Sequence, residues 1–157
     1  MARLNLSHIL TGTDFSDSSA GAVREAVRLA AGDPTRRLSV VHVCDEVVDA
    51  SALRAKVVAW TSSLPEFQAL LPSQLHPELE VGRVVEALGR CVQRTGATQL
   101  VVGPRPRGFL ERWFTGGVAE QLFHNVKVPV LATRGPCDRG YRRILVPVDF
   151  SPVAAVS

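Results

Sequence analysis

An aspartate that directly follows an apolar run is the residue of this sequence with the clearest chemical potential. Asp14 follows residues 8–13, and Ser16 stands two positions later, where it can cap a helix. The pattern returns at Asp149, 135 residues further on, with Ser151 in place of Ser16. A buried strand that ends in a carboxylate delivers that group to the edge of a sheet, where ligands bind. Asp14 is therefore a candidate binding residue, and a turn or helix-cap carboxylate is the alternative.

The repeat also predicts how the chain is divided, since one copy of the pattern corresponds to one structural unit. Residues 1–134 are expected to form a complete α/β domain. Residues 135–141, which contain glycine, proline and charged residues, are the expected linker. Residues 142–157 would then be the first strand of a second, truncated domain. A chance match between two short apolar segments is the alternative.

Composition excludes several classes of protein. With 157 residues, 46% of them apolar and 21% charged, the chain can bury the core of a globular domain. The net charge of +3 comes without a dense basic run, so no nucleic-acid partner is expected. No apolar stretch approaches the roughly 20 residues of a membrane span, so no membrane partner is expected either. Three widely spaced cysteines (Cys44, Cys91 and Cys137) favour unpaired thiols in the cytoplasm over a disulfide or zinc site.

Apolar runs alternate with helical patterns along the chain, which is typical of a doubly wound parallel sheet. A helix after Ser16 would bury Val23, Ala26, Val27 and Ala30. A second helical pattern at 47–70 breaks near Pro65, and its apolar residues at helical spacing are Leu53, Val57, Val58 and Trp60. A third, closed by Gly96, would bury Val85, Leu88, Cys91 and Val92. Pro77 places the third strand at an edge of the sheet. The five predicted strands are residues 8–13, 38–43, 75–81, 99–103 and 128–133.

In such a sheet, ligands bind beyond the carboxyl ends of the strands, where the strand order reverses. Asp14, Val43 and Gly103 follow or end three of the predicted strands and should meet there. A helix predicted to begin near Gly117 would point its amino end, with unpaired N–H groups, at the same place. That arrangement suits a phosphate group.

Five segments together resemble the universal stress protein family: residues 13–16, 41–43, 101–103, 116–120 and 128–131. The resemblance covers residues 8–134 and resumes at 142–157. It implies an adenine-nucleotide alpha hydrolase-like fold with strand order 3-2-1-4-5, a role in stress response, and frequent dimerisation through the fifth strand. It also implies that tandem two-domain members are common and that one branch binds ATP. By the same resemblance, Asp14 would contact adenine and Val43 would pack near the nucleoside.

The ATP-binding branch carries Gly-x2-Gly-x9-Gly followed by serine or threonine, and this chain matches it only in part. Gly103 and Gly116 occupy the first and third glycine positions, but Pro106 replaces the second glycine and Gly117 replaces the hydroxyl residue. The residues of this loop that would lie near phosphate are Gly103, Arg105, Gly116, Gly117 and Val118.

The substitutions act directly on phosphate binding. Pro104 and Pro106 have no N–H and fix φ near about −65°, so two possible donors are lost. A hydrogen bond to a charged group contributes about 1.5–3 kcal/mol. Losing two or three of them would weaken ATP binding by roughly two to five orders of magnitude. Three arginines (Arg105, Arg107 and Arg112) could replace the lost amides, or they could be solvated loop charges.

No set of residues in the sequence predicts catalysis. His42 follows a strand pattern and is expected to pack in the core, and Trp60 and Trp113 are expected to serve packing or an interface. No Ser/His/Asp set, Cys/His pair or metal-ligand spacing occurs in the sequence, so no enzyme and no metal site are predicted.

The sequence therefore predicts a domain that acts in stress response by association, with ATP binding weak or absent and no resident cofactor. The expected homodimer would use strand 128–133, with segment 142–148 as a second pairing strand. An ATP- or AMP-binding switch that uses Asp14 and loop 103–118 is the alternative. An electron-transfer flavoprotein-like module is disfavoured, because no glycine-rich dinucleotide motif follows the first strand.

Overall fold

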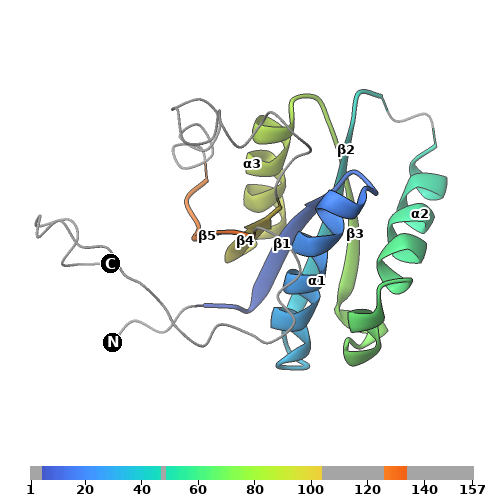
Figure 1. The fold of residues 1–157 in the computed structure, drawn as a ribbon. Coiled ribbons are helices and arrows are strands. Elements are labelled where there is room, and N and C mark those ends of the chain that lie inside the picture. Colours follow the sequence, from blue (N-terminus) through green and yellow to red (C-terminus); the bar gives the residue numbers. More distant parts are fainter. Residues whose placement is uncertain (1–4, 47–48, 104–125, 134–157) are drawn as a thin grey trace, which may run out of the picture.

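The protein is built on one five-stranded parallel sheet with the strand order β3-β2-β1-β4-β5, as predicted (Figure 1). The computed structural model describes residues 5–46, 49–103 and 126–133. In it the strands are β1 (His8–Thr13), β2 (Arg37–Cys44), β3 (Leu75–Val81), β4 (Gln99–Val102) and β5 (Val130–Ala132).

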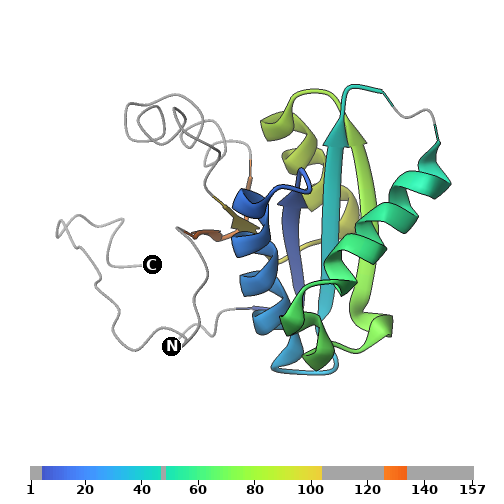
Figure 2. The ribbon, with the colours of Figure 1, turned by 45° about the vertical axis from the view of Figure 1, so that its right-hand side comes forward.

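Helices cover both faces of this sheet (Figure 2). The first two, α1 (Asp17–Ala31) and α2 (Ala50–Ser62), lie on one face, and α3 (Val84–Thr95) lies on the other. Two short 3-10 segments, η1 (Pro65–Ala69) and η2 (Pro72–Gln74), lead from α2 into β3. The doubly wound α/β architecture is thus confirmed.

Helix α1 follows its sequence pattern closely. Ser16 is the N-cap, and its hydroxyl oxygen accepts a hydrogen bond from the Ser19 N–H at 3.2 Å. The four residues predicted to face inward have no exposed surface: Val23, Ala26, Val27 and Ala30. Beyond the helix, the buried Gln74 amide lies within 3.2 Å of the carbonyl oxygens of Ala30, Asp33 and Arg36. The end of α1 is therefore held by hydrogen bonds from η2.

Helix α3 also agrees with its pattern. Leu88, Cys91 and Val92 are buried under it, whereas Val85 is only partly buried. Gly96 ends the helix in the left-handed conformation, with φ 68°. A residue with a side chain would be strained there, which explains the glycine.

Helix α2 is the most weakly embedded of the three. The predicted break near Pro65 is confirmed, because α2 ends at Ser62 and η1 begins at Pro65. Only Val57 and Thr61 of this helix are buried. Val58, which the sequence pattern grouped with the inward residues, is 37% exposed. Val57 is fully buried, whereas Val58, about 100° further round the helix, turns toward solvent.

The remaining differences concern strand ends. The fourth strand ends at Val102 instead of residue 103, and the fifth is shorter than the predicted 128–133. The edge position that Pro77 predicted for β3 is confirmed. The predicted helix near Gly117, the linker 135–141 and the segment 142–157 lie outside the described residues. Within the part of the chain that the structure describes, no helix is long and apolar enough to cross a membrane.

Candidate functional site

The candidate site lies where β1 meets its two neighbours at the carboxyl edge of the sheet. The chain runs outward from β1 to β2 and β3, and α3 then returns it to β4 on the other side of β1, so the strand order reverses at β1. Asp14 follows β1, Val43 lies near the end of β2, and Gly103 follows β4. The three residues predicted to meet are thus at one edge. The other predicted residues, Arg105, Gly116, Gly117 and Val118, lie outside the described part of the chain, as do Arg107 and Arg112.

Asp14 is engaged in a local turn. Its Oδ1 accepts hydrogen bonds from the Ser16 N–H at 3.0 Å and from the Ser16 hydroxyl at 2.5 Å. Burial favours the neutral acid, but the hydrogen bonds from Ser16 and Ser19 outweigh it and lower the pKa of Asp14 below its usual value. The side chain therefore carries its charge at neutral pH. Because it accepts a hydrogen bond from the Ser16 N–H, Asp14 also acts as a turn carboxylate, the alternative drawn from the sequence.

Phe15, the next residue, has an unusual backbone. Its φ is 64°, and it is the only non-glycine residue with positive φ in the described part of the chain. Its N–H donates to the Thr13 hydroxyl at 3.0 Å, and that hydroxyl lies 3.3 Å from the Ser19 hydroxyl. The sequence analysis missed Phe15, because no local pattern signals a left-handed phenylalanine.

The Phe15 ring is surrounded by side chains from two other elements. The His42 ring of β2 lies 4.4 Å from it, centroid to centroid, and the Trp60 ring of α2 meets it edge-on at 5.9 Å. The Lys56 ammonium group lies 4.4 Å from the ring centroid, a cation–π contact. These four side chains are called the Phe15 cluster below. Packing was the predicted role of Trp60; Trp113 lies outside the described residues.

His42 belongs to this cluster and not to the deep core. Its ring is half-buried, and its Nδ1 donates to the Thr13 carbonyl oxygen at 2.9 Å. The histidine is thus packed, as predicted, but at the strand tip. Its hydrogen bond ties the end of β2 to the last residue of β1.

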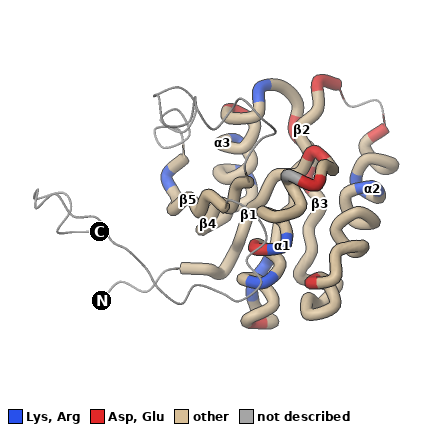
Figure 3. Tube along the Cα trace, viewed as in Figure 1, with Lys and Arg blue, Asp and Glu red and all other residues tan. Residues whose placement is uncertain are grey.

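Among the described residues, the charges at this edge are mainly negative. Figure 3 shows acidic residues gathered around the ends of β1 and β2 and the starts of α1 and α2. The exposed carboxylates there are those of Asp14, Asp17, Asp45, Glu46 and Asp49. They would repel a polyphosphate. In the described ranges, no group of three or more acidic, histidine or cysteine residues could hold a metal ion.

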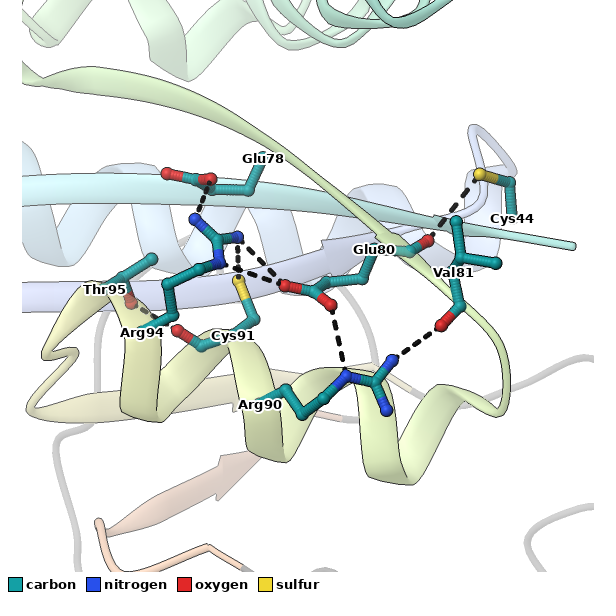
Figure 4. Close-up of polar contacts among 8 residues, drawn as sticks. All are labelled: Cys44, Glu78, Glu80, Val81, Arg90, Cys91, Arg94 and Thr95. Carbon is teal, nitrogen blue, oxygen red and sulfur yellow. Dashed lines mark hydrogen bonds and ion pairs between the residues drawn. The ribbon is translucent and has the colours of Figure 1, made fainter. Parts of the chain in front are cut away.

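A second cluster of polar residues joins β3 to α3 (Figure 4). Arg94 forms ion pairs at 3.0 Å with both Glu78 and Glu80, and Arg90 reaches Glu80 at 3.5 Å. Beneath Arg94, burial raises the pKa of the Cys91 thiol to about 12. A thiol with such a pKa is not a nucleophile at neutral pH, so this cluster holds the edge strand and offers no chemistry.

The chain matches one protein family over most of its length. The model of the universal stress protein family matches residues 5–134. The chain belongs to this family. The resemblance found in the sequence is therefore confirmed, and the fold is the adenine-nucleotide alpha hydrolase-like fold of universal stress proteins. None of the curated proteins matches the chain.

Solved universal stress proteins share the fold. One in complex with cAMP is 23% identical, with a TM-score of 0.63, and the match covers 82% of this chain and 96% of that chain. One from Archaeoglobus fulgidus is 19% identical, with a TM-score of 0.63, covering 85% of this chain and 46% of that chain. A family member from Burkholderia pseudomallei is 28% identical, with a TM-score of 0.53, covering 83% and 97%.

Proposed function

We propose that this universal stress protein domain acts in stress response by associating with a second copy of itself, with ATP binding weak or absent. The observation that carries the proposal is the position of β5 at the end of the sheet order. An edge strand carries backbone groups that are ready to pair with another strand. We further propose that the protein acts in the cytoplasm and has no catalytic residue.

The backbone of β5 indicates which groups would pair. The Thr133 N–H donates to the Val102 carbonyl at 2.9 Å, and the Pro129 carbonyl accepts from the Leu100 N–H at 3.0 Å. Alternate residues of a parallel strand direct these groups to opposite sides, so Val130 and Ala132 direct theirs away from β4. A partner's β5 would pair there, and segment 142–148 is the proposed second strand of the interface.

Weak ATP binding is supported by the state of the candidate site. Asp14 already accepts two hydrogen bonds from Ser16, and the neighbouring carboxylates oppose a polyphosphate. Pro104 and Pro106 supply no N–H to the loop after β4.

A nucleotide-dependent switch is the second candidate function. It is favoured by the position of Asp14, Val43 and Gly103 at the carboxyl ends of β1, β2 and β4, and a structural neighbour is a universal stress protein in complex with cAMP. Calorimetry with ATP and magnesium separates the two proposals. Binding in the low-micromolar range that Asp14→Ala abolishes would establish the switch, whereas no heat at millimolar ATP would support association alone.

We also propose the tandem arrangement, with a second domain beginning in segment 142–157. The repeat of the Asp14 pattern at Asp149 supports it, and this chain spans 46% of the Archaeoglobus fulgidus chain. A longer gene product that contains a second complete copy of the pattern would establish it. A stop directly after residue 157 would contradict it.

The association is tested by placing a lysine on each edge of the sheet. Ala132 ends β5, Val81 ends β3, and both are exposed, so each tolerates a longer side chain. In sedimentation velocity, Ala132→Lys should raise the dimer dissociation constant at least tenfold, because the charge meets the partner strand. The matched control Val81→Lys should leave it unchanged. A monomeric parent protein, or equal effects of the two substitutions, would contradict the proposal.

A further inference from the structure

Two helices share one face of the sheet but are anchored very differently. Helix α1 is held by an apolar face with no exposed surface and by the Gln74 hydrogen bonds. Helix α2 buries only Val57 and Thr61 and packs mainly on the edge strand β3, with smaller contacts to η1 and β2. With so few buried side chains, α2 should respond to small changes at its contacts.

One of these contacts leads to the candidate site. Trp60 and Lys56 lie one turn apart on α2, and both contact the Phe15 ring. Phe15 lies in the turn between β1 and α1, next to Asp14. The ring therefore joins the Asp14 turn directly to the most weakly embedded helix.

The backbone of Phe15 shows that the ring position is imposed by its surroundings. A left-handed conformation is unfavourable for any residue with a Cβ, and it persists only where contacts on several sides enforce it. Here the Thr13 hydroxyl accepts a hydrogen bond from the Phe15 N–H, and the His42 ring of β2 packs against the Phe15 ring at a tilt of 36°. A shift of the turn cannot leave the ring in place, because the ring follows the backbone that carries it.

We propose that Phe15 couples the Asp14 turn to α2, so that a change at either one displaces the other. A molecule that binds beside Asp14 would thereby alter the outer surface of α2. By linkage, a partner bound to α2 would alter the affinity of the site by the same factor. The coupling lies within the chain, and it holds whether or not ATP binds and whether or not the domain dimerises.

The first experiment perturbs the turn and observes α2 without any ligand. The chain has two tryptophans, so Trp113→Phe leaves Trp60 as the only one. In that background, Thr13→Val removes the hydroxyl that holds the Phe15 N–H. Thr11→Val is the matched control: Thr11 lies on the same side of β1, is fully buried, and its hydroxyl has no hydrogen-bond partner among the described residues. Acrylamide quenching of Trp60 should rise at least twofold with Thr13→Val and stay at the parent value with Thr11→Val.

The second experiment runs in the opposite direction. Trp60→Leu removes the edge-on contact from α2, and Val58→Ala, on the same helix but exposed, is its control. Hydrogen exchange of the Phe15 and Ser16 amides should become at least tenfold faster in Trp60→Leu and stay at the parent value in Val58→Ala. Lys56→Met, at an exposed position, is a second variant in case Trp60→Leu unfolds α2. It removes the cation–π contact with the Phe15 ring, and the same two amides are measured.

A negative result in either experiment overturns the proposal. Equal Trp60 quenching in the Thr13 and Thr11 variants, or unchanged Phe15 and Ser16 exchange in both the Trp60 and Lys56 variants, would show that the turn and α2 move independently. Exchange at the Leu10 amide in the middle of β1 should stay constant throughout, which separates local coupling from loss of global stability. None of these readouts depends on dimer formation or nucleotide binding, so the proposed function stands or fails separately.

Discussion

At the β3 edge of the sheet the two faces are built from different chemistry, and β3 shows the contrast within seven residues. Toward α1 and α2 this strand presents leucine, proline and valine side chains, among them Leu75 and Leu79. Toward α3 it presents His76, Glu78 and Glu80, and Ser39 and His8 continue the polar row on the same side of β2 and β1. Apolar packing secures one face of this edge, whereas hydrogen bonds and ion pairs secure the other.

The contrast shows how the β3 edge of the sheet is held in place. Strands of a parallel sheet are usually apolar on both faces, because helices cover both. Near β3, the arginines of α3 replace part of that cover, since Arg94 and Arg90 reach the two glutamates. The Phe15 cluster lies on the other, apolar face, where His42 belongs to the same alternating row as Leu38 and Val40.

The largest expected effect comes from adjacent residues of β2 that face opposite ways. Leu38→Ala should lower the free energy of unfolding by about 2–5 kcal/mol, because a fully buried side chain leaves a cavity. Ser39→Ala should cost about 1–3 kcal/mol, since the buried His8 Nε2 loses its partner at 2.9 Å. Urea denaturation of both variants measures the difference. A larger loss of unfolding free energy for Ser39→Ala than for Leu38→Ala would show that the polar face contributes more to stability than the apolar face.

A smaller effect is expected on α3. Arg94→Met should lower the free energy of unfolding by about 1 kcal/mol, because Glu78 and Glu80 lose an ion-pair partner that is itself half-exposed. The control is Arg83→Met, whose pair with Glu86 is 3.6 Å long and exposed at both ends, and it should have almost no effect. Adding 1 M salt should shrink the Arg94 effect. An Arg94 effect that salt leaves unchanged would point to packing instead of charge.

The smallest effect should appear in the dependence of stability on pH. Burial, with the nearby charge of Arg37, lowers the pKa of His8 below its ordinary 6.5, and the same causes lower the pKa of His76. A proton then binds the unfolded chain more tightly than the folded one. Their contribution is complete above about pH 6.5 and is lost as the pH falls toward the depressed folded pKa.

Urea denaturation at pH 7 and pH 5 measures this loss. His8→Gln keeps a side chain that can hydrogen bond to Ser39 but does not titrate, so it should lose less stability over this interval than the parent. Glu78 faces both histidines and moderates the effect. Identical losses in the variant and the parent would show that His8 does not contribute.

Local patterns in the sequence were sufficient for the elements and for part of the site. The strands, the inward faces of α1 and α3, the break before Pro65 and the edge position of β3 were all predicted. Each follows from the periodicity or backbone chemistry of a few neighbouring residues. The meeting of Asp14, Val43 and Gly103 followed from the general rule that parallel strands end at one edge.

Only the tertiary structure decided which distant groups meet. The Gln74 amide binds carbonyls of residues 30–36, His8 meets Ser39, and Phe15 is fixed in a left-handed turn by side chains from β2 and α2. No periodicity encodes such contacts, because each depends on where two separate elements come to lie after folding. The sequence by itself therefore determined the elements and the edge where a ligand would bind, and the packing of those elements decided how the Asp14 turn is held.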